Sequence, residues 1–260
     1  MTEEQVQVRV YGDASLPTLI YLPGLHGDWT LIGSFRQQVL GKVRFVEMTY
    51  PRTFTWSLED YAKAIESALA QHGISRGWLL GESFGSQPLW ELVKRQNVQV
   101  DGVILAGGFV KHTMRWAVRL AEKIAGRLSL RVITWLIFTY GKLAHFRYRH
   151  SPETMATLKE FAARRTVEDV RAAQHRLHLI AENNACATAS VVKVPVYAMT
   201  GFIDPIVPWP FVRRWLRKNC ATLKDYKIIP GADHAVLATA PRPAAAQVLQ
   251  WIESSTAHGG

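Results

Sequence analysis

The sequence contains little cysteine, no apolar leader and no repeats. Only two cysteines occur in 260 residues, Cys186 and Cys220, which is too few for a disulfide framework or a cysteine-rich metal site. The first residues, Met1 to Glu4, lack the basic stretch and the following apolar run of a signal peptide. These absences favour a single ordinary domain in a reducing compartment, so we expect a cytoplasmic protein.

The most informative motif that is present is Gly81-Glu82-Ser83-Phe84-Gly85, a G-x-S-x-G pattern. It follows the short apolar run 77–80, and residues 86–96 predict a helix. A strand, a tight turn and a helix form the setting of a nucleophile elbow, in which the turn lifts the serine hydroxyl clear of the sheet. The start of the helix beneath the serine also favours developing negative charge.

Two polar residues downstream complete a candidate catalytic set. Asp204 follows the apolar run 194–201, and His234 follows a predicted strand at 222–229. Loops at the carboxyl ends of strands are where open α/β sheets build their sites. A serine hydroxyl needs a base to accept its proton, histidine suits that role near neutral pH, and an aspartate can orient the imidazole. Asp233 is a rival acid, but a residue adjacent to His234 is poorly placed to face it.

The chain order Ser83, Asp204, His234 resembles that of the α/β-hydrolase superfamily, and the similarity extends over nearly the whole sequence. The resemblance implies an α/β fold with a mostly parallel sheet and helices on both faces. It also implies a catalytic triad of these three residues, without a metal ion or an organic cofactor. A serine nucleophile excludes the aspartate-nucleophile branches of the superfamily, the dehalogenases and epoxide hydrolases.

The resemblance further implies two backbone N–H donors for the oxyanion of a tetrahedral intermediate. One is the N–H of Phe84, the residue after the nucleophile. The loop 23–28 resembles the family's His-Gly-x loop with proline in place of the histidine, which makes the N–H of Leu25 the second donor. A shifted alignment would select Asp28, whose carboxylate would crowd an oxyanion. Asp28 is better explained as the N-cap of a helix that begins near Trp29.

Strand and helix patterns alternate through residues 1–109 and 191–260, which we predict to form the hydrolase core domain. Alternation of this kind is typical of a mostly parallel sheet covered on both faces. The predicted strands are 5–11, 18–22, 43–48, 77–80, 100–106, 194–201 and 222–229. The predicted helices are 29–40, 57–72, 86–96, 210–219 and 243–254.

Between residues 110 and 190 the alternation stops, and the resemblance places a helical cap there. Helical segments are predicted at 113–127, 130–146, 152–164 and 166–182. Residues 132–140 are apolar on all sides and too few to span a bilayer, so we expect them to pack on the core and line an acyl pocket. The candidate substrate-binding residues are Trp116, Trp135, Phe138 and Tyr140 in the cap, and Trp209 after Asp204.

Basic residues are concentrated in this predicted cap. It contains 14 Lys and Arg against 6 Asp and Glu, a net +8 of the chain's +10. Solvated helix faces explain part of this excess, and an anionic partner such as an acyl carrier protein or a membrane surface is the alternative. Arg115, Arg119 and Lys123 recur every four residues and predict a basic ridge. No nucleic-acid recognition motif accompanies the charge, so we expect no nucleic-acid partner.

These features predict a serine hydrolase that cleaves a small-molecule carboxylic ester through an acyl-enzyme on Ser83. His234 would then activate the water that releases the acyl group. Two alternatives stay open. One is hydrolysis of an acyl thioester or carrier-linked ester with help from the basic cap, and the other is a hydrolase-fold ligand-binding or receptor protein with slow turnover. Lactones and C–C bonds are cleaved by the same triad order, because fold does not determine the substrate.

Overall fold

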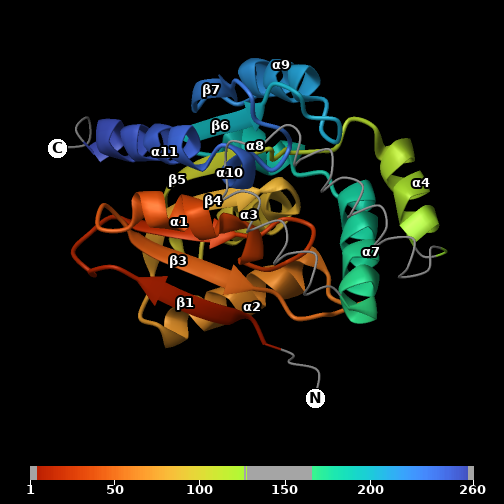
Figure 1. The fold of residues 1–260 in the computed structure, drawn as a ribbon, viewed down its shortest axis with the longest axis horizontal. Helices are drawn as coiled ribbons and strands as arrows, with labels where there is room; N and C mark the ends of the chain where they lie inside the picture. The colour runs from red at the N-terminus through yellow and green to blue at the C-terminus, as the bar shows by residue number, and fades with distance from the viewer. Residues whose placement is uncertain (1–4, 126, 128–165, 257–260) are drawn as a thin grey trace.

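The computed structural model describes residues 5–125, 127 and 166–256 (Figure 1). The predicted helices 130–146 and 152–164, with the candidate pocket residues Trp135, Phe138 and Tyr140, lie outside this described part. No helix within the described ranges is long and apolar enough to cross a membrane.

A seven-stranded sheet in the order β1-β3-β2-β4-β5-β6-β7 forms the centre of the molecule. Strand β1 pairs antiparallel with β3, and every other pair is parallel, which confirms the predicted fold class. The strands are β1 Gln7–Tyr11, β2 Thr18–Leu22, β3 Arg44–Thr49, β4 Arg76–Glu82, β5 Gln99–Ala106, β6 Val196–Gly201 and β7 Leu223–Ile229.

Helices cover both faces of the sheet. Successive strand residues point to opposite faces, and apolar side chains occur on both faces. Leu19 and Tyr21 of β2 join one buried cluster, and Ile20 and Leu22 join the other. The first cluster is covered by α1 Gly33–Val39, α10 Val236–Thr239 and α11 Pro241–Thr256. The second is covered by α2 Leu58–Gln71, α3 Ser86–Arg95, α8 Cys186–Val191 and α9 Trp209–Asn219.

Local capping explains where several helices begin. Ser57 caps α2 and exchanges hydrogen bonds with Asp60 in a capping box, so the predicted start of this helix is confirmed. The helix predicted near Trp29 begins later, as a short 3-10 turn η1 at Thr30–Ile32 followed by α1. Asp28 nevertheless accepts a hydrogen bond from the N–H of Thr30, close to the expected capping role.

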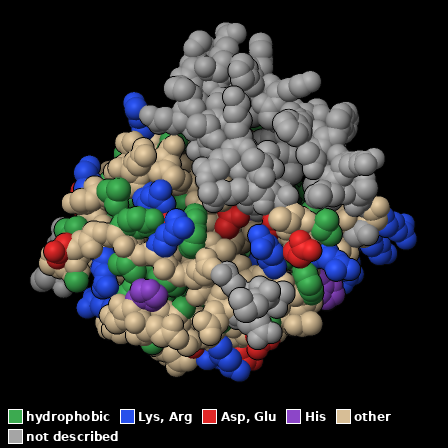
Figure 2. Space-filling model, turned by 60° about the horizontal axis from the view of Figure 1, so that its bottom comes forward, with side chains coloured by type: hydrophobic (Ala, Val, Ile, Leu, Met, Phe, Trp, Pro, Cys, Tyr) green, Lys and Arg blue, Asp and Glu red, His purple; other side chains and the backbone are tan. Residues whose placement is uncertain are grey.

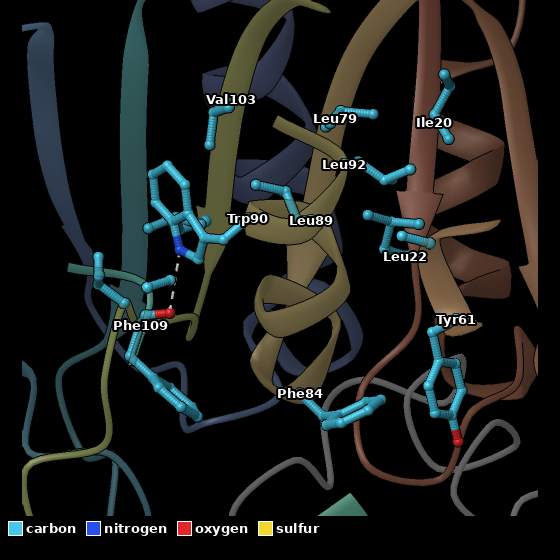
Figure 3. Packing of buried hydrophobic residues seen from close by; sticks show 14 of the residues in the cluster. Ile20, Leu22, Tyr61, Leu79, Phe84, Leu89, Trp90, Leu92, Val103 and Phe109 are labelled. Atoms are coloured by element: carbon cyan, nitrogen blue, oxygen red, sulfur yellow. Dashed lines mark hydrogen bonds between the residues drawn. The ribbon is translucent and has the colours of Figure 1, made fainter. Parts of the chain in front are cut away.

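Helix α3, which follows the candidate elbow, packs in the centre of one face (Figure 3). Its Leu89, Trp90 and Leu92 lie against side chains of β2, β4 and β5. The indole Nε1 of Trp90 donates to the carbonyl of Phe109 at 3.3 Å, just beyond β5. The same carbonyl accepts hydrogen bonds from Ser86 Oγ and Gln87 Nε2, so the start of α3 is tied to the end of β5.

Three described helices lie in or across the predicted cap between β5 and β6, and the last of them, α8, is a helix that the sequence did not predict. Helices α4 Arg115–Ala125 and α7 Val167–Glu182 pack against each other beside one end of the sheet (Figure 1). Thr166 and Asp169 form a capping box at the start of α7, and this helix was predicted within one residue. The cap boundaries at 110 and 190 stay a prediction.

Candidate active site

The motif around Ser83 forms a sharp turn between β4 and α3. Ser83 has φ of 49°, in the left-handed region where residues with a side chain are strained. The flanking glycines permit close packing, since a Cβ on Gly85 would lie 2.1 Å from the carbonyl oxygen of Leu22. A Cβ on Gly81 would lie 2.9 Å from a methyl of Leu89 in α3. The strand–turn–helix geometry expected of an elbow is therefore present.

The structure brings Ser83, His234 and Asp204 together in one hydrogen-bonded line. The Nε2 of His234 lies 2.8 Å from Ser83 Oγ, and its Nδ1 lies 2.8 Å from Asp204 Oδ2. Asp204 can accept only from an Nδ1–H, which leaves Nε2 free to accept the serine proton. The arrangement is chemically that of a nucleophile, a general base and an orienting acid.

The loop after β6 holds Asp204 in its ionised form. The side chain is removed from solvent, and burial by itself would raise its pKa. The hydrogen bond and charge of His234, with the N–H groups of Val207 and Ile206, outweigh burial and lower the pKa of Asp204. Both N–H groups donate to Oδ1, which directs Oδ2 towards the imidazole.

Asp233, the rival acid, is engaged elsewhere. Its Oδ1 accepts from the hydroxyl of Thr239 at 3.1 Å and from the N–H of Ala235 at 3.0 Å. These bonds fold the loop that carries His234 into a compact turn before α10. The geometry thus pairs Asp204 with the histidine and gives Asp233 a role in shaping the loop.

The loop predicted to supply an oxyanion donor lies against the elbow. It forms a turn closed by a 2.9 Å hydrogen bond from the N–H of Gly27 to the carbonyl of Gly24. A Cβ on Gly24 would be 3.6 Å from Ser83 Cβ, so the turn and the nucleophile are neighbours. Leu25 is the second residue of this turn, and Phe84 follows the nucleophile directly. The roles of their N–H groups are part of the proposal below.

Glu82 and Tyr21 form a buried pair behind the serine that sequence patterns do not reveal. The Tyr21 hydroxyl donates to Glu82 Oε2, while the fully buried Oε1 has no partner among the described residues. Burial is the largest influence and raises the pKa of Glu82. The Tyr21 bond and the His234 charge act in the opposite direction without reversing the shift.

A raised pKa gives a stability prediction for Glu82. The fold favours the protonated carboxyl, so its stabilising contribution is complete below the unfolded-state pKa and is lost as pH rises through the folded-state pKa. We expect the difference in Tm, Glu82→Gln minus wild type, to become more positive between pH 5 and pH 8. Thermal unfolding at the two pH values checks this, with Glu91→Gln as the control, a partly exposed carboxylate on α3 that pairs with Lys94. A difference that is constant or falls with pH would contradict it.

Arg176 is a second residue that sequence reasoning assigned no role. It was counted only with the basic residues of the cap, yet it is 1 % exposed. Its neighbours at helical spacing, Ala172 and Ile180, are also buried on α7. An arginine in the middle of an apolar helix face was the available signal. Its contacts lead to the oxyanion loop and are described below.

The two described substrate-binding candidates lie on different helices, Trp116 on α4 and Trp209 on α9. Trp116 is 71 % exposed. Trp209 begins α9, where its Nε1 donates to the carbonyl of Phe202 at 3.1 Å. Trp209 thus packs on the loop that carries Asp204. The substrate-binding role of Trp209 stays a prediction.

The predicted basic ridge on α4 lies partly against α7, although Arg119 and Lys123 are exposed. Arg115 donates to the carbonyls of Ala181 and Glu182, and Arg119 forms a 2.8 Å ion pair with the Glu182 carboxylate. Two of the three ridge residues therefore join α4 to α7, and the ridge as a partner surface stays a prediction. On the face shown in Figure 2, Lys and Arg side chains are scattered among other types and do not form one patch.

Metal ligation is not indicated in the described ranges, where no group of three or more His, Cys, Asp or Glu side chains could hold an ion. The histidines of α7 contact protein groups, and the Nε2 of His175 lies 2.8 Å from the carbonyl oxygen of Trp56. Its partner by helical spacing, His178, contacts the Glu122 carboxylate at 3.2 Å.

The sheet order, the elbow and the hydrogen-bonded line define an α/β hydrolase. The chain belongs to the serine aminopeptidase S33 family, whose sequence model matches residues 46–239, a range that contains Ser83, Asp204 and His234. It is therefore a hydrolase by family. No curated protein sequence matches this chain.

Solved structures with the same fold cover nearly the whole chain. An esterase from Thermogutta terrifontis is 17 % identical with a TM-score of 0.79, over 96 % of this chain and 93 % of that one. An enol-lactonase from Burkholderia xenovorans is 14 % identical with a TM-score of 0.79, over 95 % and 96 %. An esterase from Exiguobacterium antarcticum is 13 % identical with a TM-score of 0.77, over 95 % of each. At these identities the similarity establishes the fold.

Proposed function

We propose that this protein hydrolyses carboxylic esters through an acyl-enzyme on Ser83. The observation that carries the proposal is the His234 imidazole, which lies 2.8 Å from both Ser83 Oγ and Asp204 Oδ2. A hydroxyl, a base and an orienting carboxylate in this order are the groups that acyl transfer requires.

The reaction follows from these positions. As Ser83 Oγ attacks the ester carbonyl, its proton passes to His234 Nε2, and the carbonyl oxygen becomes an oxyanion. The N–H groups of Leu25 and Phe84 stabilise that oxyanion. Collapse of the intermediate expels the alkoxide, which takes the proton from His234 and leaves as an alcohol. Water then attacks the acyl-enzyme while His234 takes its proton, and the second intermediate collapses to the acid as His234 returns that proton to Ser83 Oγ.

Esters are favoured as substrates by the solved structures, two of which are named esterases. The family description names an aminopeptidase instead, and the enol-lactonase suggests a cyclic ester as a further class. An alkoxide is a better leaving group than an amine, so a triad that cleaves amides also cleaves activated esters. Ester substrates therefore test the mechanism first.

The test compares p-nitrophenyl esters, from acetyl to palmitoyl, with aminoacyl p-nitroanilides and simple lactones. Ester turnover with saturation, and labelling of Ser83 by a fluorophosphonate, would support the proposal. The acyl chain length with the highest kcat/KM indicates how long an acyl chain the pocket accommodates. Turnover of nitroanilides with ester rates no greater than background would reject the esterase assignment. Labelling without turnover of any substrate would favour the ligand-binding alternative.

A second candidate, hydrolysis of an ester carried by an anionic partner, is supported by helix α9. A hollow of about 440 Å³ on this helix is lined by Trp209, Pro210, Arg213, Arg214, Arg217 and Lys218. Among the described residues these four cations form no ion pair, and Arg213 Nε is buried without an acceptor. The adjoining loop that carries Asp204 exposes Phe202, Ile203 and Ile206. Cations without an ion-pair partner in the described part of the chain thus adjoin an apolar surface beside the site.

Charge reversal on α9 tests this candidate. We expect the double variant Arg214→Glu, Arg217→Glu to lower kcat/KM for an acylated acyl carrier protein by about tenfold or more at low salt, since long-range attraction raises the encounter rate. Activity on p-nitrophenyl esters should be unchanged. Lys42→Glu with Lys63→Glu makes the same charge change on distant exposed positions. Equal losses in both double variants would reject a specific role for α9.

A further inference from the structure

Arg176 is a buried cation that connects the cap helix α7 to three segments of the core. Its Nη1 donates to the carbonyl of Leu25 at 2.9 Å, and its Nη2 donates to the carbonyl of Pro51 at 3.2 Å. Its Nε donates to the hydroxyl of Tyr61 on α2 at 3.2 Å. With 1 % of its surface exposed, the guanidinium is part of the interior.

The guanidinium of Arg176 is surrounded by uncharged groups. Its three acceptors are two carbonyls and a phenol, all uncharged. The faces of Tyr50 and Phe84 lie 5.6 and 6.0 Å from the guanidinium carbon, close enough for cation–π attraction. Burying a charge without a counter-charge is costly, and an uncharged side chain of similar length would fill the same space. Packing alone is therefore a poor explanation for an arginine here.

One end of the guanidinium holds the turn that contains Leu25. The bond from Nη1 fixes the peptide that follows Leu25, and the Gly27 N–H to Gly24 bond closes the turn around it. Gly27 adopts φ of +77°, and a Cβ on it would lie 2.4 Å from Nη1. The turn thus leaves room for the guanidinium, which holds the peptide adjoining the one that carries the Leu25 N–H.

The other contact reaches the residue after the nucleophile. Figure 3 shows the Phe84 and Tyr61 rings near each other at the foot of α3, and their centroids are 5.6 Å apart at 73°. Arg176 bonds to the hydroxyl of Tyr61 and lies over the Phe84 ring. The same side chain therefore touches both residues whose N–H groups are proposed to bind the oxyanion.

We infer that Arg176 is a positioning residue that keeps the N–H groups of Leu25 and Phe84 aimed at one oxyanion. The inference rests on the proposed serine-hydrolase function. Because Arg176 comes from the cap, the oxyanion hole is complete only when α7 lies against the core. The positive charge beside Phe84 adds to the electrostatic preference for a negative intermediate.

The experiment measures kcat, KM and boronic acid inhibition for Arg176→Met and Arg176→Lys. A boronic acid forms a tetrahedral adduct on the serine, and so reports on the oxyanion hole without turnover. Losing one oxyanion donor lowers kcat by about 10²–10³-fold. We expect Arg176→Met to lose kcat in that range with KM changed less than about threefold, and its inhibition constant to rise in parallel. Arg176→Lys keeps the positive charge but loses the planar guanidinium with its several donors, so its kcat should fall about tenfold.

Tyr61→Phe is the matched control. It removes the acceptor of Nε but keeps the ring and both carbonyl bonds of Arg176, so kcat should fall by less than about threefold. Thermal unfolding of each variant shows whether it is folded. Fluorophosphonate titration gives the fraction of molecules with a reactive Ser83. Rates are then expressed per labelled molecule, which separates positioning from loss of fold.

A wild-type kcat and inhibitor affinity in Arg176→Met, per labelled molecule, would overturn the inference. So would a lower Tm with unchanged kcat, which is the signature of a structural role. If the methionine variant does not fold, the lysine variant decides the question on the same readouts. Wild-type protein that cleaves no ester would reject the proposed function instead, and boronic acid affinity would still compare the variants.

Discussion

Replacing Ser83 with alanine is expected to reduce kcat/KM for p-nitrophenyl esters by about 10⁴- to 10⁶-fold. The variant loses the only atom that can form the acyl-enzyme, and triads act as a unit, so removal of the nucleophile removes nearly their whole contribution. His234 and the oxyanion donors remain, and substrate binding should be retained. KM, or the inhibition constant of a non-hydrolysable ester analogue, should therefore change little.

Initial rates and fluorophosphonate labelling check this result, with Ser75→Ala as the control. Ser75 is exposed before β4, so the same chemical change there should leave the rates unaltered. Retention of more than about a tenth of the wild-type rate by Ser83→Ala would mean that another group performs the hydrolysis. The acyl-enzyme mechanism would then be rejected, whatever the substrate.

Replacing Asp204 with asparagine is expected to lower kcat by about 10⁴-fold, the second largest effect. The amide can present an N–H to Nδ1, which favours the wrong imidazole tautomer and leaves Nε2 protonated instead of accepting from Ser83. The imidazolium that forms during reaction also loses its carboxylate partner. Asp233→Asn removes the same charge from the residue next to His234. We expect less than about a tenfold loss there, because Asp233 contacts Thr239 and Ala235.

Rates for the two variants, with Tm at several pH values, test the assignment. The lowered pKa of Asp204 means that its ionised form stabilises the fold above the unfolded-state pKa, a contribution lost as pH falls through the folded-state pKa. The stability difference between wild type and Asp204→Asn should therefore shrink in acid. If Asp233→Asn loses more activity than Asp204→Asn, the acid of the triad has been misassigned.

Local patterns were sufficient where the determinants are neighbours in sequence. The capping box of Ser57 and Asp60, the apolar run of β2 and the glycines around Ser83 each act over a few residues, and each led to the correct element. The order of the three polar residues then indicated the site. Helix α10 was missed because four residues are too few to show a helical period.

Contacts between distant residues were not predictable from these patterns. The Tyr21–Glu82 bond joins residues 61 positions apart, and the Arg176–Leu25 bond joins residues 151 apart. Both depend on how the strands and the cap come together. The ion pair of the α4 ridge was not predictable for the same reason: helical spacing identifies a shared face but not which residues of another helix contact that face. In this structure Glu182 on α7 forms an ion pair with Arg119 of the ridge. The ridge as a partner surface stays a prediction.

The junction between cap and core also bears on how this enzyme could be re-engineered. The N–H of Ala185 donates to the carbonyl of Val110. The two ends of the predicted cap therefore lie next to each other where they join the core. The Nδ2 of Asn183 donates to Gln87 Oε1 on α3, which ties the C-terminal end of the predicted cap to the elbow helix. An insertion whose ends already meet can be exchanged without stretching the scaffold. A cap from another hydrolase, spliced after Val110 and before Asn183, should therefore leave the elbow undisturbed and change what the enzyme accepts, provided that it supplies an arginine in the place of Arg176.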